Sequence, residues 1–376
     1  MSETEFTTPQ GTLTLKRYPV RAADRLRAWD AADELLINHL HEQQITLAGK
    51  NILVFDDQFG AISGYLCQSL KLQGEDASID VMTDSLISEK AIQQNLTQNG
   101  FDQTSGAVSF VDNTVIPEKS YDLIIYKLPR NHAYLADVMQ RLRSQLASTT
   151  YIVGGAMVKY LPKTVLTMLG QTVGETTTSL AVKKARLIFS QFDSQLTPVN
   201  PFPTQYSIED IDVELLNHSN VFSRESLDIG TRLLLAVMPE SDDPLTIVDL
   251  ACGNGVVGIS AGQLNPNAAL IFCDESNMAV ASTKANVERY LAGRKPRVFQ
   301  TDCLAGVEQN SVDLVLCNPP FHQQNTVSEH VGWQMFKESL GCLKSGGELW
   351  VVVFQAHQLS LQLRGKQHQQ PPLGFR

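Results

Sequence analysis

Two short motifs in the 376-residue chain carry residue types that could hold an amine for chemistry. The first, Asn318-Pro319-Pro320-Phe321, directly follows an apolar run over residues 312–317. An asparagine carbonyl and the backbone carbonyl after it can accept the two hydrogens of a conjugated amine. The two prolines fix the turn and have no N–H that would compete, and the aromatic ring can stack on the ring that bears the amine. This turn therefore predicts a site that presents a flat amino group to an electrophile.

The second motif is a glycine-rich turn that follows the apolar residues 246–250. Gly253, Gly255 and Gly258 fit the G-x-G-x-x-G spacing of a turn that binds a nucleotide-type cofactor. Asp274 closes the next apolar run, where an acid can accept hydrogen bonds from both ribose hydroxyls. A dinucleotide-binding enzyme would share these features, but hydride transfer has no use for the Asn318 turn. The pair therefore favours methyl transfer from S-adenosyl-L-methionine (AdoMet).

Other residues give weaker signals. Asp302 follows a third apolar run and can accept from the adenine amine, although a capping or turn role fits equally. Phe222 and Asp228 flank Ser223, which is predicted to be a helix N-cap, and Phe222 can close over a cofactor. The predicted catalytic residues are Asn318, Pro319, Pro320 and Phe321; the predicted cofactor-binding residues are Phe222, Asp228, Asp249, Cys252, Gly253, Gly255, Asp274, Asp302 and Asn318.

Four segments carry a family resemblance: NVFSRESLDIGTRLLL, IVDLACGNGVVGIS, FCDESNMAVASTKANV and VDLVLCNPPFHQ. They resemble the ribosomal RNA guanine-N2 methyltransferases of the RlmG/RsmC family, with the large-subunit branch closest. RAWDAADELLINHL and ILVFDDQFGAIS in the N-terminal half are similar to that branch too, so the resemblance extends to about Val352. It implies AdoMet-dependent methylation of the exocyclic N2 of one guanine in 23S ribosomal RNA, with 16S ribosomal RNA as the alternative substrate.

The chain also contains an internal duplication. Residues 52–63 align with 247–258, residues 82–85 with 272–275, and residues 121–125 with 312–316. Both halves are therefore predicted to be Rossmann-like α/β domains of the class I methyltransferase type in tandem. The first copy has Gln58 in place of Gly253 and Lys127-Leu128-Pro129-Arg130 in place of the catalytic turn, so we expect it to be degenerate.

The predicted domain limits follow from this duplication and from composition. Residues 1–195 form the degenerate domain, which binds RNA or supports its partner, residues 196–205 a proline-rich linker, and residues 206–354 the catalytic domain. From residue 355 the sequence is polar, rich in glutamine and without strand-like alternation, where the family resemblance ends. We therefore expect residues 355–376 to be a truncated or altered, disordered tail that leaves a sheet edge exposed.

Composition excludes several classes of protein. The chain has no apolar stretch long enough to span a membrane and no apolar leader, and its six cysteines form no C-x-x-C pair. These features predict a cytoplasmic protein without a structural metal, and nothing in the sequence indicates an obligate protein partner. The formal net charge of −10 argues against RNA binding. Basic clusters in the first copy can offset it unless they are solvated faces or a domain interface: Lys16, Arg17, Arg21, Arg25, Arg27, Lys183, Lys184 and Arg186.

Two further functions fit parts of the pattern. A protein-glutamine N5 methyltransferase uses a similar Asn-Pro-Pro-aromatic turn, but that family has a small helical leader domain and typically a tyrosine at the last position. A non-catalytic RNA-binding assembly factor would keep the fold after losing activity, as the first copy has. Binding of AdoMet distinguishes the assembly factor from the enzymes.

Overall fold

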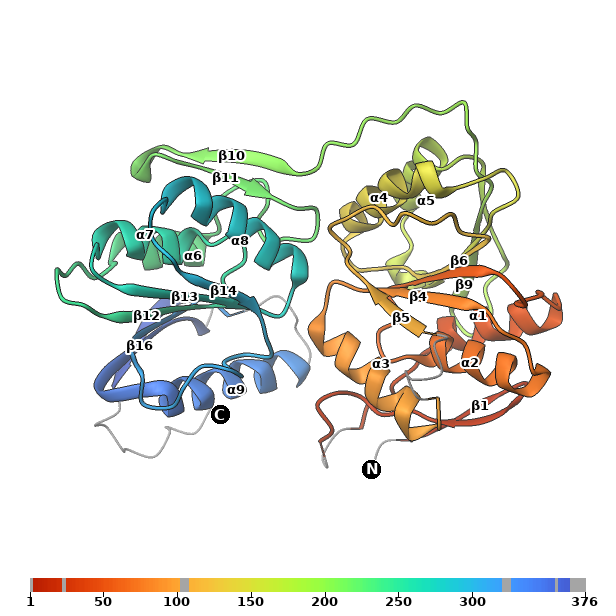
Figure 1. Ribbon diagram of the computed structural model, residues 1–376, viewed down its shortest axis with the longest axis horizontal. Helices are drawn as coiled ribbons and strands as arrows, with labels where there is room; N and C mark the ends of the chain where they lie inside the picture. The colour runs from red at the N-terminus through yellow and green to blue at the C-terminus, as the bar shows by residue number, and fades with distance from the viewer. Residues whose placement is uncertain (1–2, 22–24, 102–107, 320–325, 356–357, 366–376) are drawn as a thin grey trace. The chain divides into compact units, whose positions relative to one another are not determined.

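The computed structural model describes residues 3–21, 25–101, 108–319, 326–355 and 358–365. The chain divides into two compact units, Met1–Pro201 and Phe202–Arg376. The division lies inside the proline-rich stretch 196–205. Each unit is an α/β domain built on a largely parallel sheet, which confirms the predicted fold class (Figure 1).

The N-terminal domain has a seven-stranded sheet in the order β5-β4-β3-β6-β7-β9-β8. The first five strands in that order are parallel, and β9 runs antiparallel between β7 and β8. Helices α1 to α3 cover one face and α4 and α5 the other (Figure 1). The elements are β1 (Glu5–Thr8), β2 (Gly11–Thr14), α1 (Ala31–Glu42), β3 (Asn51–Phe55), α2 (Ala61–Gln73), β4 (Ser78–Met82), α3 (Leu86–Gln98), β5 (Val108–Val111), β6 (Leu123–Lys127), α4 (His132–Arg141), β7 (Tyr151–Met157), α5 (Lys163–Thr172), β8 (Thr176–Thr178) and β9 (Ala185–Ser190).

The C-terminal domain has a six-stranded sheet in the order β14-β13-β12-β15-β16-β17. The first five strands in that order, from β14 to β16, are parallel. Helices α6 to α8 cover one face of the sheet and α9 the other (Figure 1). The elements are β10 (Thr204–Ile208), β11 (Val213–Asn217), α6 (Ile229–Ala236), β12 (Thr246–Leu250), α7 (Val256–Leu264), β13 (Ala269–Asp274), α8 (Asn277–Tyr290), β14 (Arg297–Gln300), β15 (Val312–Cys317), α9 (Thr326–Cys342), β16 (Leu343–Gln355) and β17 (Gln358–Gly365).

Burial explains why the central strands are continuous apolar runs. Every residue of β6 is buried, and in β3 and β12 only the first residue is partly exposed. A parallel sheet covered by helices on both faces needs apolar side chains in both directions, so strand alternation disappears. Because burying a polar side chain is costly unless it is paired, most residues that can do chemistry gather where β12, β13 and β15 end.

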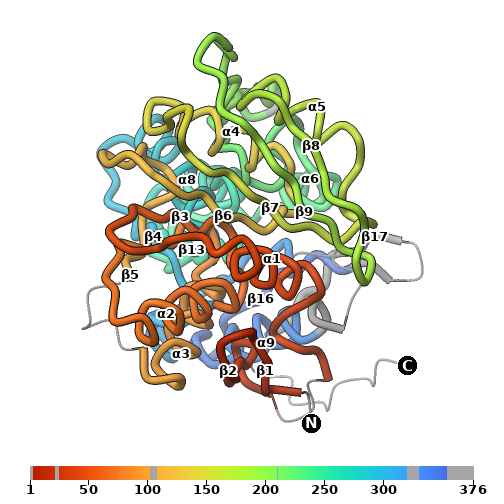
Figure 2. The backbone as a smooth tube through the Cα atoms, turned by 90° about the vertical axis from the view of Figure 1, so that its right-hand side faces the viewer, coloured from red at the N-terminus to blue at the C-terminus, as the bar shows by residue number. Residues whose placement is uncertain are grey.

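The prediction of a strandless, disordered tail is wrong for Gln358–Gly365. These residues form β17, which pairs antiparallel with β16 from Glu348↔Gly365 to Gln355↔Gln358. Figure 2 draws β16 in blue. In the N-terminal domain α5 and β8 separate β7 from its antiparallel neighbour β9, whereas β17 follows β16 almost directly. Backbone pairing therefore fills the place of a closing strand despite a polar sequence. Residues 366–376 of the expected tail lie outside the described residues.

Strand pairing also corrects one detail of the duplication. Asn51 pairs with Ser78 in the first copy, and Thr246 pairs with Ala269 in the second. The helix that follows begins after N-cap Ser85 in one copy and after N-cap Ser276 in the other. Thr83, and not Asp84 as the sequence alignment placed it, therefore occupies the position of Asp274. The first copy has lost this acid as well.

Candidate active site

The glycine-rich turn, residues 251–255, which we call the cofactor turn after its predicted role, connects the end of β12 to α7 through three residues with positive φ. These are Ala251 at 59°, Gly253 at 57° and Gly255 at 86°, and Gly255 is the N-cap of α7. The left-handed region is unfavourable for residues with a Cβ atom, so two of the three are glycines. The turn places backbone N–H groups at the carboxyl ends of the parallel strands, where α/β sheets bind their ligands.

The three glycines of the motif are needed for different reasons. A Cβ atom at Gly258 would lie 2.2 Å from Cε1 of Phe272, so this glycine lets α7 pack on β13. A Cβ atom at Gly255 would lie 3.0 Å from Cγ2 of Thr283. Beside Gly253 there is open space, with no described heavy atom within 4 Å of a built Cβ atom. Only Gly253 therefore leaves its backbone open to a ligand.

Two aspartates hold the turn in different ways. Asp274 accepts from the backbone N of Gly253 at 2.9 Å and from that of Ser276 at 3.0 Å. Asp249 is buried and accepts from the backbone N of Gly258 at 2.8 Å. Burial raises the pKa of Asp249 to about 7, with a smaller contribution from Asp274. Asp249 therefore joins β12 to α7 from inside the protein, whereas the partly exposed Asp274 lies beside open glycine backbone.

Sequence reasoning missed the polar network behind this turn. Asn254 donates to Oδ1 of Asn217 at 2.8 Å and to the hydroxyl of Tyr206 at 3.2 Å, which lie on the β10–β11 hairpin. Asn286 of α8 donates to the carbonyl of Asn254 at 2.9 Å and to that of Leu216 at 3.0 Å. The asparagines themselves are visible in the sequence, but the residues to which they hydrogen-bond lie far away along the chain. The hairpin is thereby part of the support of the turn.

Asn318 stands directly after β15, beside the strand that carries the cofactor turn. Its Nδ2 donates to Oδ2 of Asp228 and to Oγ1 of Thr231, both at 3.0 Å. Its Oδ1 is buried and accepts a hydrogen bond from no described residue. Asp228 is the N-cap of α6, so the prediction that Ser223 caps this helix is wrong; Ser223 lies in a turn with φ 51°.

The remaining predicted site residues have fewer described contacts with the two turns. Asp302 accepts from Nε2 of Gln334 of α9 at 3.1 Å. Phe222 is 55% exposed in the segment before α6. Cys252 is buried, with its Sγ 3.4 Å from Oγ1 of Thr283. Pro319 is described and partly buried, whereas Pro320 and Phe321 lie outside the described residues. The assignments of individual residues to cofactor and catalytic roles stay predictions.

The first copy has an ion pair where the second has Asn318. Strand pairing places Lys127 at that position, and its Nζ lies 2.7 Å from Oδ2 of Asp33 and 3.5 Å from Oδ2 of Asp30. Burial raises the pKa of Asp33 to about 6, which Lys127 opposes. Burial alone would lower the pKa of Lys127, but the carboxylates of Asp33 and Asp30 raise it. In the first copy, a buried salt bridge thus fills the position that Asn318 occupies in the second.

Side chains also fill the first copy near its former cofactor turn. Tyr134 is fully buried, with its ring 5.0 Å from that of Phe55. Asn113 donates to the hydroxyl of Tyr134 at 3.0 Å and to Oδ1 of Asp84 at 2.9 Å. Asn113, which follows β5, therefore donates both to this tyrosine and to Asp84, which follows β4. Together with the loss of the acid at Thr83, this explains the degeneracy in structural terms.

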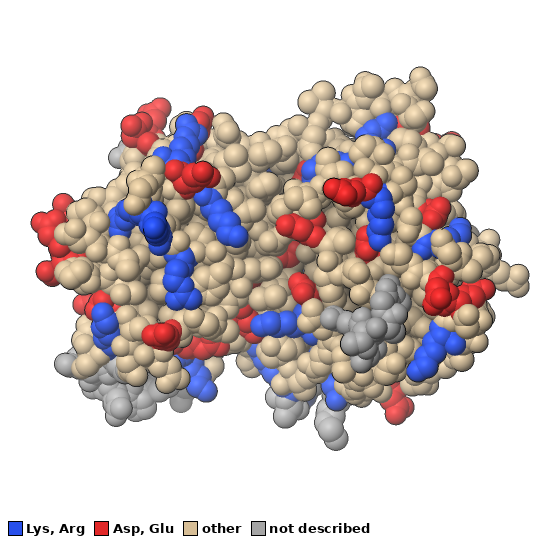
Figure 3. Space-filling model, viewed as in Figure 1, with Lys and Arg blue, Asp and Glu red and all other residues tan. Residues whose placement is uncertain are grey.

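The two basic clusters of the N-terminal domain meet at one carboxylate. Glu34 of α1 lies 3.6 Å from Arg27 and 2.8 Å from Lys183. Sequence reasoning missed a neighbouring group: Arg130 and Lys159 lie over the exposed ring of Tyr160, at 5.6 and 4.4 Å from its centroid. Figure 3 shows basic and acidic side chains interspersed over the visible face. Of the other predicted cations, Arg17 lies over Phe59, Arg186 donates to Thr178, and Lys16, Arg21, Arg25 and Lys184 are at least partly exposed.

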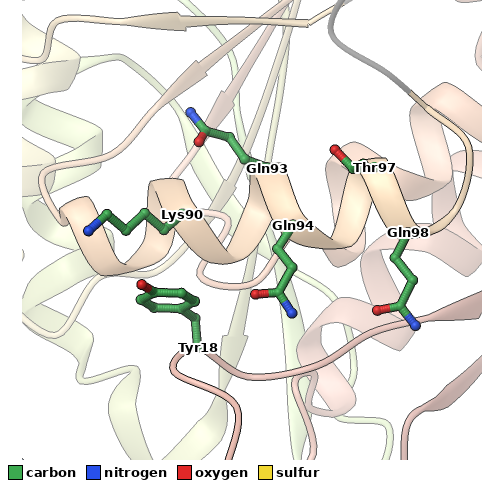
Figure 4. A pocket seen from close by; sticks show the side chains of 6 residues that line it. All are labelled: Tyr18, Lys90, Gln93, Gln94, Thr97 and Gln98. Atoms are coloured by element: carbon green, nitrogen blue, oxygen red, sulfur yellow. The ribbon is translucent and has the colours of Figure 1, made fainter.

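A pocket of about 530 Å³ lies in the N-terminal domain along α3 (Figure 4). The Tyr18 ring faces Lys90, whose Nζ is 5.9 Å from the ring centroid, and the other lining residues are Gln93, Gln94, Thr97 and Gln98. None of the motif residues lines this pocket. Within the described ranges, no three His, Cys, Asp or Glu side chains group as metal ligands, and no described helix is long and apolar enough to cross a membrane.

The fold and the paired turns define an AdoMet-dependent class I methyltransferase. Residues 212–368 match the family model of the methyltransferase small domain, and residues 3–194 match that of the RLMG N-terminal domain. The chain belongs to the ribosomal RNA large subunit methyltransferase G family. It is 42% identical to the Pseudomonas paraeruginosa protein of that name, over 92% of this chain and 90% of the relative, and 41% identical to the Photobacterium profundum one, over 91% and 88%.

Among solved structures, the chain is similar to the T. thermophilus 16S rRNA N2 G1207 methyltransferase (RsmC) in complex with AdoMet and guanosine. The TM-score is 0.68 over 93% of this chain and 89% of that one, at 18% identity, which shows a shared fold. The present site fits the cofactor, because the open backbone of Gly253 and the carboxylate of Asp274 lie together at the strand ends.

Proposed function

We propose that this protein methylates the exocyclic N2 of one guanine in 23S ribosomal RNA, with AdoMet as methyl donor. The observation that carries the proposal is the Asn318 carboxamide. Its Nδ2 donates to Asp228 and Thr231, whereas its Oδ1 is buried without a described donor. An amine nitrogen with two hydrogens supplies the donor that this oxygen lacks. Membership of the large-subunit family favours 23S over 16S ribosomal RNA.

The residues of the chain divide the work between binding and orientation. Asp274 would hold the ribose, Gly253 would admit the cofactor against its backbone, and Asp302 would accept from the adenine amine. AdoMet, when bound, supplies an electrophilic methyl group. Asn318 Oδ1 and the Pro319 carbonyl would accept the two hydrogens of the guanine amine and direct its lone pair at the methyl carbon. Orientation of the nitrogen is the main contribution of the protein.

Asn318→Ala tests this role. We expect AdoMet affinity within about twofold of the parent and a methylation rate lower by roughly two orders of magnitude, as for loss of a transition-state hydrogen bond. The assay measures single-turnover methyl transfer to 23S ribosomal RNA from cells that lack this gene, with AdoMet binding by calorimetry. A parent-like rate in Asn318→Ala would overturn the amine-holding mechanism.

The acceptor is tested by offering three substrates to the parent enzyme. These are 23S ribosomal RNA, 16S ribosomal RNA and a glutamine-containing peptide, and the product nucleoside is identified by mass spectrometry. N2-methylguanosine in 23S ribosomal RNA alone supports the proposal. A methylated peptide would favour the glutamine methyltransferase, and the absence of both AdoMet binding and any methylated product would favour an assembly factor. Because its substrate is assembled into ribosomes there, we place the enzyme in the cytoplasm.

The N-terminal domain is proposed to hold the ribosomal RNA. The group formed by Arg130, Lys159 and Tyr160 offers two cations and an exposed ring, which suits a phosphate beside an unstacked base. Arg27 and Lys183 extend the positive charge, although Glu34 neutralises part of it. We infer that the degenerate copy contributes substrate affinity while the catalytic copy contributes chemistry.

Paired variants test this division. Arg130→Gln with Lys159→Gln should weaken RNA binding and reduce the slope of log affinity against log salt by up to about two units if both touch phosphates. Lys71→Gln is the matched control, because Lys71 also lies over an aromatic ring, that of Phe101, in the same domain. AdoMet affinity should not change. An unaltered salt slope in the double variant would remove the RNA role of this group.

A further inference from the structure

The first turn of α6 holds the Asn318 carboxamide in one orientation. Asp228 Oδ2 accepts from Nδ2 of Asn318 at 3.0 Å and from the backbone N of Thr231 at 3.1 Å, which ties the carboxylate to the helix. Thr231 Oγ1 accepts from the same Nδ2 at 3.0 Å. A carboxylate oxygen can only accept, so rotating the amide by half a turn would set two oxygens against each other. The helix therefore determines which atom of Asn318 points to the substrate.

We propose that Asp228 and Thr231 are positioning residues that aim Oδ1 of Asn318 at the target amine, and that Gly230 leaves the room in which this oxygen lies. The inference rests on the proposed function, in which Oδ1 accepts a hydrogen from that amine. An amide free to turn would present its N–H groups to the amine for part of the time, and these repel the amine hydrogens. Fixing the amide before the substrate arrives removes this reorganisation from the reaction.

Any side chain at position 230 would crowd Oδ1 of Asn318. A Cβ atom there would lie 2.8 Å from Oδ1 of Asn318, 2.9 Å from Oδ2 of Asp228 and 3.1 Å from Cγ1 of Val352. Gly230 is the second residue of α6 and has no positive φ, so its backbone conformation does not call for glycine. Glycine weakens a helix relative to alanine. Its presence is explained by the space that the Asn318 carboxamide requires.

The degenerate domain supplies an internal comparison. Its α1 begins with N-cap Asp30 and has Asp33 as third residue, and both carboxylates hold Lys127 at the end of β6. The residue in the place of Gly230 is Ala32. The first turn of α1 therefore holds Lys127 at the end of β6, just as the first turn of α6 holds Asn318 after β15. Glycine occurs only in the copy that keeps an asparagine, so it serves the chemistry rather than the fold.

Two variants and a matched control for each test this clamp of Asn318 by Asp228, Gly230 and Thr231. The assay is single-turnover methylation of 23S ribosomal RNA, with AdoMet affinity and melting temperature measured alongside. Thr231→Val keeps the shape but removes the hydroxyl, and should slow methyl transfer about tenfold, as for loss of one hydrogen bond. Thr231→Ser keeps the acceptor and should stay within about twofold of the parent. Gly230→Ala should slow transfer at least about tenfold, while Gly341→Ala, in a helical position with open space, should not.

A double variant separates positioning from simple support of the fold. Thr231→Val in an Asn318→Ala background should cause no further loss of rate, because the amide it orients is gone. If the loss is the same in both backgrounds, Thr231 only supports the fold and the clamp is overturned. If Asn318→Ala is slow but Thr231→Val and Gly230→Ala react at the parent rate, the clamp alone fails. A parent-like rate for Asn318→Ala instead removes the proposed mechanism. If Thr231→Val lowers the melting temperature, the methylation rate of Gly230→Ala is used to test the clamp instead.

Discussion

Lys127→Met should reveal how much the N-terminal domain depends on its buried salt bridge. Lys127 and Asp33 are 8% and 2% exposed in their side chains, and 2.7 Å separates the charged atoms. Removing one partner of a buried pair leaves an uncompensated charge, which typically costs about 3–5 kcal/mol. Lys183→Met is the control, because its 2.8 Å pair with Glu34 is 71% exposed on the lysine side and should contribute less than about 1 kcal/mol.

The pH dependence of this loss follows from Asp33. Its pKa is about 6 beside Lys127, against 3.8 when unperturbed, and removal of the cation raises it further. The folded variant then keeps a proton that the unfolded chain releases, so its stability falls relative to the parent as pH rises from about 6 to 8, by about 1.4 kcal/mol per pH unit. Adding Asp33→Asn should abolish this slope.

Urea titration read by hydrogen–deuterium exchange of α1 and β6 measures the N-terminal domain in the full chain. A destabilisation of Lys127→Met below about 1 kcal/mol at pH 8 would refute the reasoning. A loss that is equal at pH 6 and pH 8 would also do so, because it would show that Asp33 does not carry the cost.

Two further predictions concern the catalytic domain. Gly258→Ala should destabilise it by about 1–3 kcal/mol in urea, because the new Cβ atom would lie 2.2 Å from Cε1 of Phe272. Asp249→Asn keeps an acceptor for the Gly258 N–H while removing a carboxyl group whose pKa burial raises to about 7. It should raise stability at pH 8 by up to roughly 4 kcal/mol, an effect that shrinks toward pH 4 because the parent stability falls as pH rises between 3.8 and about 7. A pH-independent effect would contradict the buried-carboxylate explanation.

The sequence predicted the fold and the glycine-rich turn because their signals are local. Glycines at fixed spacing and an apolar run that ends in Asp274 or Asn318 are visible without the third dimension. The duplication predicted the second domain, but residues 82–85 were aligned one residue out of register. Asp84 offers an aspartate to align, and the sequence does not show strand pairing. The polar tail was misread for a related reason, since β17 is held by backbone bonds to β16.

Partners that are distant in sequence could not be predicted. Asp228 was expected beside the cofactor, yet its carboxylate contacts Asn318, which lies 90 residues away. Lys127 read only as the loss of a catalytic asparagine, and its buried pairing with Asp33 emerged from packing. Arg130 and Tyr160 form a group because β6 and β7 are neighbours in the sheet. In each case the missing information was which strand ends lie together.

The β10–β11 hairpin sets a limit on where the chain can be divided. The match to the methyltransferase small domain begins at residue 212, after β10 has ended. A fragment cut there would lose Tyr206, and β11 would lose its paired strand. Asn217, which binds Asn254 of the cofactor turn, would then sit on an unpaired strand. Any dissection of the two activities should therefore begin the catalytic fragment at the Pro201–Phe202 division, where the hairpin stays with the turn that it supports.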